Sequence, residues 1–122
     1  MAERLLIVED EDTLCESLKR VFTRDGYEVD VASSAESALE LLGERSYDLI
    51  ITDIVLPGIS GIELLRRYKK QKPLQKVVIM TAYANLETAV EALRAGAVDY
   101  VTKPLTHEEI KRVVREAIEK DG

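Results

Sequence analysis

Short apolar runs alternate along this chain with longer stretches in which apolar residues recur every three or four positions. A short continuous apolar run is typical of a buried strand, and the longer periodicity is typical of an amphipathic helix. The last stretch shows the helical pattern clearly, with Ile110, Val113, Val114 and Ala117 at spacings of three and four. Strands are predicted at residues 4–8, 27–31, 49–53, 77–81 and 98–102.

Polar residues suited to capping a helix stand at the start of each helical stretch. Such a side chain accepts a hydrogen bond from a free backbone N–H of the first turn. Ser60 with Glu63, and Thr106 with Glu109, have the spacing of a capping box. The predicted caps are Asp12 or Thr13, Ser34, Ser60, Asn85 and Thr106, and Gly26, Gly43 and Gly96 are predicted to end three helices.

Strand and helix alternate five times, and this predicts a doubly wound α/β fold with a five-stranded parallel sheet. Residues 27–31 alternate with a period of two, so they belong at a sheet edge, and the simplest strand order is 2-1-3-4-5. The 122 residues fit one domain spanning 1–122. In the fourth helix we expect Leu86, Ala89, Val90 and Leu93 to face the core.

Composition narrows the classes of function. The formal net charge of -6 argues against a nucleic-acid or anionic-membrane surface, because both require excess Lys and Arg. No apolar run approaches the roughly 20 residues of a membrane helix, and no signal peptide is recognised. The single cysteine, Cys15, predicts a reduced, cytoplasmic setting, and we expect it to pack as a small apolar group.

Polar side chains follow four of the five predicted strands. Glu9 and Asp10 follow the first, Asp53 ends the third, Thr81 ends the fourth and Lys103 follows the fifth. In this kind of sheet the functional crevice lies at the carboxyl ends of the strands, where the winding direction reverses. Each residue alone has an ordinary explanation, such as a helix cap or a turn. Together at one sheet edge, they indicate a site.

Three carboxylates in one crevice repel one another, so a cation is expected among them. Oxygen donors without His or Cys favour Mg²⁺. Asp10 and Asp53 are the predicted direct ligands, Glu9 acts through a bound water, and the Val55 carbonyl completes the set.

Lys103 adds a positive charge to this crevice and Thr81 adds a hydroxyl. A metal, an ammonium and a hydroxyl around one carboxylate suit a phosphoryl group. Asp53 is therefore the predicted nucleophile, which becomes an acyl phosphate.

These motifs resemble the receiver domain of two-component response regulators, which has the CheY-like fold. The resemblance covers essentially the whole chain. It implies phosphotransfer from the phosphohistidine of a sensor histidine kinase, or from a phosphotransfer protein, to Asp53, followed by slow hydrolysis. Mg²⁺ is the implied cofactor, with Mn²⁺ able to replace it. The motifs are Glu9-Asp10, Asp53 with Leu56-Pro57-Gly58 and Gly61, Thr81-Ala82, and Lys103-Pro104.

The resemblance also assigns roles around the phosphoryl group. Thr81 and Ala82 would contact it with Lys103, and Thr81 and Tyr100 would form the switch, with Tyr100 turning inward on activation. The peptide bond before Pro104 would be cis. Two positions that tune the lifetime of the acyl phosphate in such domains correspond to Val55 and Tyr83. Neither offers an acid or an amide to orient water, so slow self-hydrolysis is expected.

The implied output surface comprises the fourth helix, the fifth strand and the fifth helix, and the implied output is transcriptional regulation through a linked effector domain. The protein would be a signalling switch without a separate enzymatic activity. We expect His107 to be exposed and without a role in the site, and Asp48 to make a local turn bond. A homodimer through the output surface could pair Glu87, Glu91, Arg94, Asp99, Lys111 and Arg115.

Three alternatives remain on the same topology. A phosphatase of the haloacid-dehalogenase type also uses an Asp nucleophile, but it needs a second acid two positions later, where Val55 stands. A flavodoxin-like cofactor module would have a Ser-, Thr- or Gly-rich first loop instead of residues 9–12. The third alternative is a receiver that binds proteins independently of phosphorylation.

Overall fold

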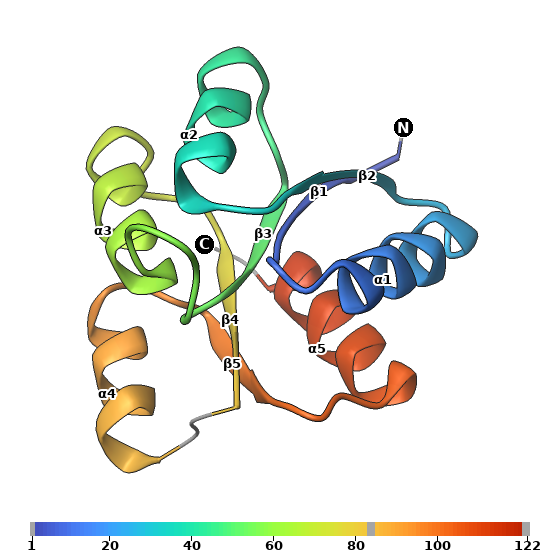
Figure 1. Cartoon of the computed structure of the whole chain (residues 1–122). Coiled ribbons are helices and arrows are strands. Elements are labelled where there is room, and N and C mark those ends of the chain that lie inside the picture. Colours follow the sequence, from blue (N-terminus) through green and yellow to red (C-terminus); the bar gives the residue numbers. More distant parts are fainter. Residues whose placement is uncertain (1, 83–84, 121–122) are drawn as a thin grey trace.

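The computed structural model describes residues 2–82 and 85–120. Their strands form one five-stranded parallel sheet, which is flanked by helices (Figure 1). The strand order is β2-β1-β3-β4-β5, as the sequence predicts, with β2 at one edge. All four strand pairs are parallel. The strands are β1 (Arg4–Val8), β2 (Glu28–Ala32), β3 (Leu49–Asp53), β4 (Val77–Thr81) and β5 (Asp99–Thr102).

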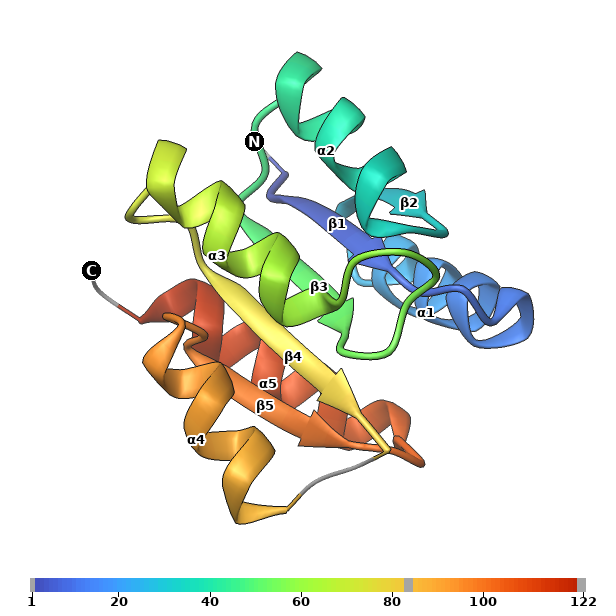
Figure 2. The ribbon, with the colours of Figure 1, turned by 60° about the vertical axis from the view of Figure 1, so that its left-hand side comes forward.

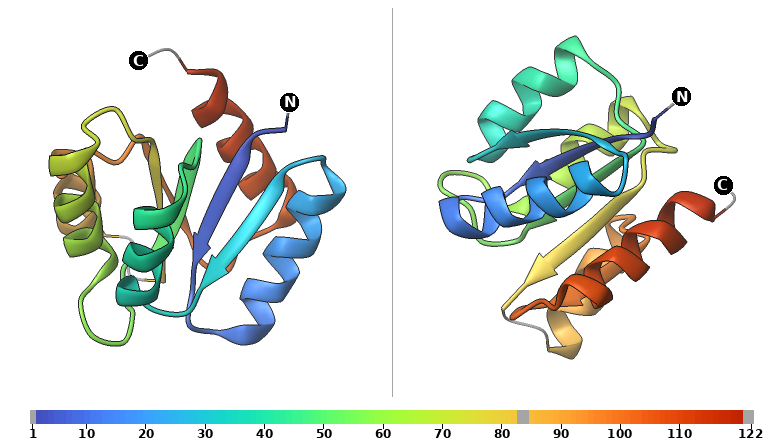
Figure 3. Two further views of the ribbon diagram at one scale, coloured as in Figure 1. Left: turned by 90° about the horizontal axis from the view of Figure 1, so that it is seen from above. Right: turned by 90° about the vertical axis from the view of Figure 1, so that its right-hand side faces the viewer.

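Five helices cover the two faces of the sheet. Helices α1 and α5 lie on one face, and α2, α3 and α4 lie on the other (Figure 3). No helix among the described residues is both long and apolar enough to cross a membrane. The helices are α1 (Asp12–Arg24), α2 (Ala35–Glu44), α3 (Gly61–Gln71), α4 (Leu86–Arg94) and α5 (His107–Glu119).

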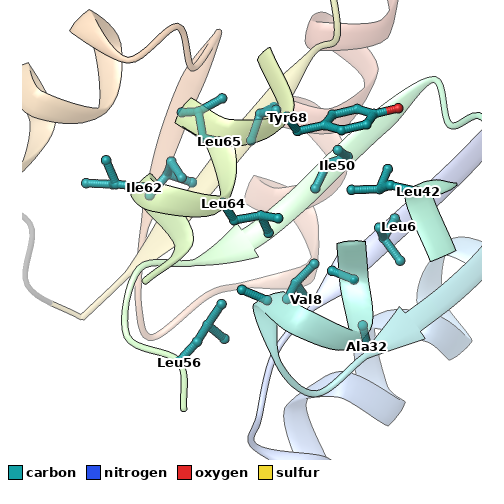
Figure 4. Packing of buried hydrophobic residues seen from close by; sticks show 14 of the residues in the cluster. Leu6, Val8, Ala32, Leu42, Ile50, Leu56, Ile62, Leu64, Leu65 and Tyr68 are labelled. Atoms are coloured by element: carbon teal, nitrogen blue, oxygen red, sulfur yellow. The ribbon is translucent and has the colours of Figure 1, made fainter. Parts of the chain in front are cut away.

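The alternation of side chains along each strand creates two separate cores. In β1, Leu5 and Ile7 pack toward α1 and α5, whereas Leu6 and Val8 pack toward α2 and α3. Figure 4 shows the second core, in which Ile50 of β3 lies among residues of α2 and α3. Because both faces are covered, β3 and β4 are buried at every position, which holds their carboxyl ends rigidly.

Four predicted caps are confirmed. The side chains of Ser34, Ser60, Asn85 and Thr106 each accept a hydrogen bond from the backbone N–H three residues later. The prediction for α1 is wrong, because Asp12 is its first residue and Glu11 is its N-cap, without a side-chain hydrogen bond.

The predicted capping boxes form only in part. At Ser60 and Thr106 only the hydroxyl half is present, and Glu63 pairs instead with Arg67, at 3.0 Å. A complete box joins Ser34 to Ser37, and another joins Asn85 to Thr88. A short hydroxyl stays beside the N-cap N–H, whereas a longer glutamate can reach a cation one turn away.

Some boundaries and contacts also differ from prediction. β2 and β5 each begin one residue later than expected, and α2 continues past Gly43 to Glu44. Asp48 does not make a local turn bond, since its Oδ2 accepts the Arg4 N–H at 2.7 Å across the start of the sheet.

Cys15 is buried among apolar side chains as predicted. His107 is exposed as predicted.

The predicted inward face of α4 is wrong for two of its four residues, Leu86 and Leu93. Leu86 is 81% exposed and Leu93 is 50% exposed, whereas Ala92 is fully buried. Ala89 and Val90 are half-buried. α4 packs beside the edge strand β5, where a small residue allows the helix to approach, so its larger apolar side chains lie at the rim.

Candidate functional site

The predicted site residues meet at the carboxyl edge of the sheet, where the arrowheads of β3, β4 and β5 point (Figure 2). Parallel register brings the strand ends level, with Thr52 opposite Val8, Asp53 opposite Met80 and Thr81 opposite Thr102. One carboxylate oxygen each from Glu9, Asp10 and Asp53 lies within 4.8 Å of the others. The topology therefore gathers acids that are far apart along the chain.

Lys103 joins two of these acids. Its Nζ lies 2.7 Å from Asp53 Oδ2 and 2.7 Å from Glu9 Oε1. Its backbone N–H donates to the Thr81 carbonyl at 2.8 Å, which fixes the base of the side chain at the end of β4. The Lys103–Pro104 peptide bond is cis, as expected from the resemblance. The ammonium thus lies between residues that follow or end β1 and β3.

Burial and ion pairing oppose each other in this cluster. Burial raises the pKa of Glu9, and the hydrogen bond from Lys103 only partly offsets this. Burial alone would lower the pKa of Lys103, but its hydrogen bonds to Asp53 and Glu9 outweigh that effect, and the pKa is raised. Lys103 therefore stays an ammonium at neutral pH.

The backbone and side chain of Asp53 are held by separate contacts. The Asp53 side chain is almost buried, and its Oδ1 accepts the Val55 N–H at 3.2 Å. The Thr52 hydroxyl donates to the Asp53 carbonyl oxygen at 3.0 Å. The Cα of Gly61 packs so closely on this carbonyl that an added Cβ would collide with it. Sequence reasoning missed Thr52, although a hydroxyl within an apolar strand signals that a polar partner is required.

The other predicted site residues are Thr81, Ala82, Tyr100, Val55 and Tyr83. Thr81 is buried at the end of β4, and Ala82 beyond it is exposed. Tyr100 is 37% exposed on β5, so its side chain is not enclosed by the core. Val55 is exposed at the rim. Tyr83, the other lifetime position, lies outside the described residues.

The acids form a donor set that fits a hard divalent cation. All three offer oxygen, and Mg²⁺ binds through one or two carboxylates while keeping several waters. Asp10 is exposed, and among the described residues no hydrogen bond or ion pair engages its carboxylate. Both oxygens of Glu9 already accept protein donors, Lys103 Nζ and the Glu11 N–H at 3.1 Å. The oxygens of Asp53 also accept protein donors, the Val55 N–H and Lys103 Nζ, so the donor set includes one open carboxylate, Asp10, and two that are already engaged.

Comparison with known families agrees with this geometry. Residues 5–115 match the model of the response regulator receiver domain, and the chain belongs to that family. Its fold is the CheY-like one, with a TM-score of 0.93 to a CheY-like receiver domain protein from Methanospirillum hungatei. That structure is 34% identical, and the match covers 98% of this chain and 95% of the other.

Longer relatives carry a similar segment. The regulatory protein AtoC of Escherichia coli K12 is 40% identical over 116 residues, which is 95% of this chain and 25% of AtoC. NtrX from Brucella abortus is 36% identical with a TM-score of 0.91, covering 98% of this chain and 28% of NtrX. The chain thus spans about a quarter of the length of AtoC and of NtrX.

Proposed function

We propose that this chain is a phosphoacceptor switch in which Asp53 receives a phosphoryl group from the phosphohistidine of a histidine kinase or phosphotransfer protein. The supporting observation is the nearly buried Asp53 carboxylate, paired with Lys103 inside an acidic oxygen cluster. An Asp53 oxygen forms a bond to phosphorus as the phosphorus–nitrogen bond to the donor imidazole breaks. The electron pair of that bond leaves with the imidazole nitrogen.

Asp10, Asp53 and the Val55 carbonyl would hold Mg²⁺ or Mn²⁺, and Glu9 would reach it only through a water. When bound, the ion supplies positive charge that stabilises the phosphoryl oxygens. Lys103 would move from Asp53 Oδ2 to a phosphoryl oxygen. Thr81 and Ala82 would provide the remaining contacts.

The output would follow from a shift of Thr81 toward the phosphoryl group and of Tyr100 into the core. We place the output on the face of α4, β5 and α5, with transcriptional regulation through a linked effector domain and a cytoplasmic location. AtoC is named a regulatory protein and is about four times as long as this chain, which supports a regulatory output through a linked domain. Of the six charged residues proposed to pair in a homodimer, Glu91 already contacts Arg66 and Lys111 contacts Asp25.

The proposal is tested with acetyl phosphate, MgCl₂ and intact-mass spectrometry. We expect wild type to gain one phosphoryl group and Asp53→Asn to gain none, because the amide is not a nucleophile. Asp48→Asn is the matched control, since it precedes the same strand and keeps an oxygen for the Arg4 N–H. A wild-type protein that stays unmodified, or an Asp53→Asn variant that is modified equally, would contradict the proposal.

The lifetime of the phosphoprotein provides another prediction. Val55 carries no acid or amide that could orient an attacking water, so the acyl phosphate should decay slowly after the donor is removed. We expect Val55→Glu to change the decay rate without preventing phosphorylation, since Val55 is exposed. Mass spectra taken over time measure the decay. Loss of the label from wild type within seconds would disprove slow self-hydrolysis.

A further inference from the structure

We propose that residues 66–76, called here the basic segment, form a docking surface for an acidic segment of a separate partner protein that also carries apolar side chains. The basic segment contains six of the 17 basic residues of the chain and none of its 23 acidic residues. Its formal charge is therefore +6, and that of the rest of the chain is -12. A concentration of positive charge on an otherwise acidic chain favours an acidic partner.

The basic segment lies at the end of the sheet opposite the Asp53 site. It comprises the second half of α3 and the loop that leads into β4. Figure 2 shows this loop at the end of the sheet away from the strand arrowheads. A groove of about 450 Å³ opens beside the loop, and Ile118 of α5 contributes to its lining. A partner seated there would not cover the Asp53 site.

A tight turn in this loop presents Leu74 to solvent. The Gln75 N–H donates to the Lys72 carbonyl at 3.0 Å, which closes a four-residue turn with Pro73 at its second position. Leu74 is 84% exposed and lines the groove. Covering such a side chain with an apolar residue of a partner is favourable, because it removes apolar surface from water.

Two lysines hold the loop in place through backbone carbonyls. Lys69 Nζ donates to the Gln75 carbonyl at 3.0 Å, and Lys76 Nζ donates to the Ile118 carbonyl at 2.9 Å. These bonds fix the loop against α3 and the end of α5, so a partner would have little to order on binding. A carbonyl carries no net charge, so these bonds leave the positive charge of both lysines uncompensated.

Lys70 and Lys72 supply the accessible charge. Both are exposed, and no carboxylate pairs with either ammonium in the part of the chain that the structure describes. Their place at the end of α3 suits the helix dipole, but the dipole does not explain the exposed Leu74. Asp48 is the one acid among the described residues that line the groove, and its Oδ2 already accepts the Arg4 N–H. The surface thus combines two accessible ammonium groups with an exposed apolar side chain.

Two features favour a short acidic protein segment over a nucleic acid or a membrane. Arginine suits phosphate best, but both arginines of the basic segment are paired, Arg67 with Glu63 at 3.0 Å and Arg66 with Glu91 at 3.4 Å. A duplex or a bilayer would also extend beyond the basic segment onto a chain whose remaining charge is -12, which repels phosphates. A short segment avoids this repulsion and can place an apolar side chain against Leu74.

The test measures, by fluorescence anisotropy at physiological salt, the binding of a labelled peptide of four Glu-Glu-Leu repeats. We expect Lys70→Gln combined with Lys72→Gln to weaken binding about tenfold, and Leu74→Ser to weaken it about fivefold. Lys19→Gln combined with Arg20→Gln is the matched control. It removes the same charge from exposed positions of α1 and should change the affinity less than about twofold.

Equal losses in the two double variants would mean that the peptide responds only to net charge, and they would overturn the proposal. A wild-type protein that does not bind the peptide at millimolar concentration would overturn it as well. All the substituted residues of these variants are exposed, so the fold should be retained, and far-UV circular dichroism checks this.

Two further peptides test the chemistry without any protein variant. Gln-Gln-Leu repeats remove the charge and Glu-Glu-Ser repeats remove the apolar side chain, and each should bind wild type about fivefold more weakly. Equal affinity for the Glu-Glu-Leu and Glu-Glu-Ser peptides would overturn a surface that uses Leu74. Tighter binding of a short DNA duplex or of phosphatidylserine vesicles would overturn the choice of a protein partner. None of these measurements requires phosphorylation of Asp53, so they are independent of the proposed function.

Discussion

Ala92→Gln is expected to lower the free energy of unfolding by about 3 kcal/mol, whereas Leu93→Gln should lower it by less than about 1 kcal/mol. Ala92 is fully buried between α4 and the sheet, and a glutamine there would force the helix outward and bury an amide. Leu93 is already 50% exposed. Urea unfolding followed by circular dichroism measures both values.

The two substitutions form a matched pair, because they introduce the same side chain into adjacent positions of one helix. Glutamine is a good helix former and carries no charge, so helix propensity and the helix dipole contribute little to the difference. A larger loss for Leu93→Gln would mean that the Leu86–Leu93 stripe faces the sheet, which would contradict the orientation of α4 described above.

Gly61→Ala is expected to lower stability by about 2–3 kcal/mol and to slow phosphorylation of Asp53 by up to about 10²-fold. A Cβ on Gly61 would collide with the Asp53 carbonyl oxygen and would lie 2.9 Å from the carbonyl carbon and 3.0 Å from Thr52 Oγ1. Two of these atoms are main chain, so a rotamer change cannot relieve the clash. The carboxylate must move with the backbone.

Gly43→Ala is the control for this substitution. Gly43 lies within α2, and outside its chain neighbours and the backbone of its own helix turn nothing lies within 4 Å of an added Cβ, so alanine should raise stability by about 0.5–1 kcal/mol and leave phosphorylation unchanged. Urea unfolding and intact-mass time courses measure both properties. If Gly61→Ala is phosphorylated at the wild-type rate, close packing of Gly61 does not position Asp53.

Most of the fold could be predicted, because it follows from local signals and general connection rules. The period-two pattern of residues 27–31 placed β2 at an edge, and the apolar runs of β3 and β4 placed them inside. The orientation of α4 could not be predicted. The apolar periodicity of α4 predicts that a stripe of large side chains is buried. In the structure the fully buried residue is the small Ala92, because α4 lies close beside β5.

The candidate site residues could also be predicted from local signals, because polar residues stand where the buried strands end. Thr52 was missed because it lies within a strand and acts through the backbone of its neighbour. The predicted capping boxes at Ser60 and Thr106 are incomplete. For the box at Ser60, the sequence spacing cannot show that Glu63 has Arg67 within reach.

By itself, the sequence determined the alternation of strands and helices and the residues at the strand ends, because strand and helix periodicity and turn chemistry act over a few residues. The family was indicated by the resemblance of the motifs at those strand ends. Only the tertiary structure decided which atoms of those residues already have a hydrogen-bond or ion-pair partner. Lys103 contacts Glu9 and Asp53 across separations of 94 and 50 positions. Whether a carboxylate is open, like Asp10, or engaged, like Glu9, depends on donors that the fold brings from other strands and from the backbone.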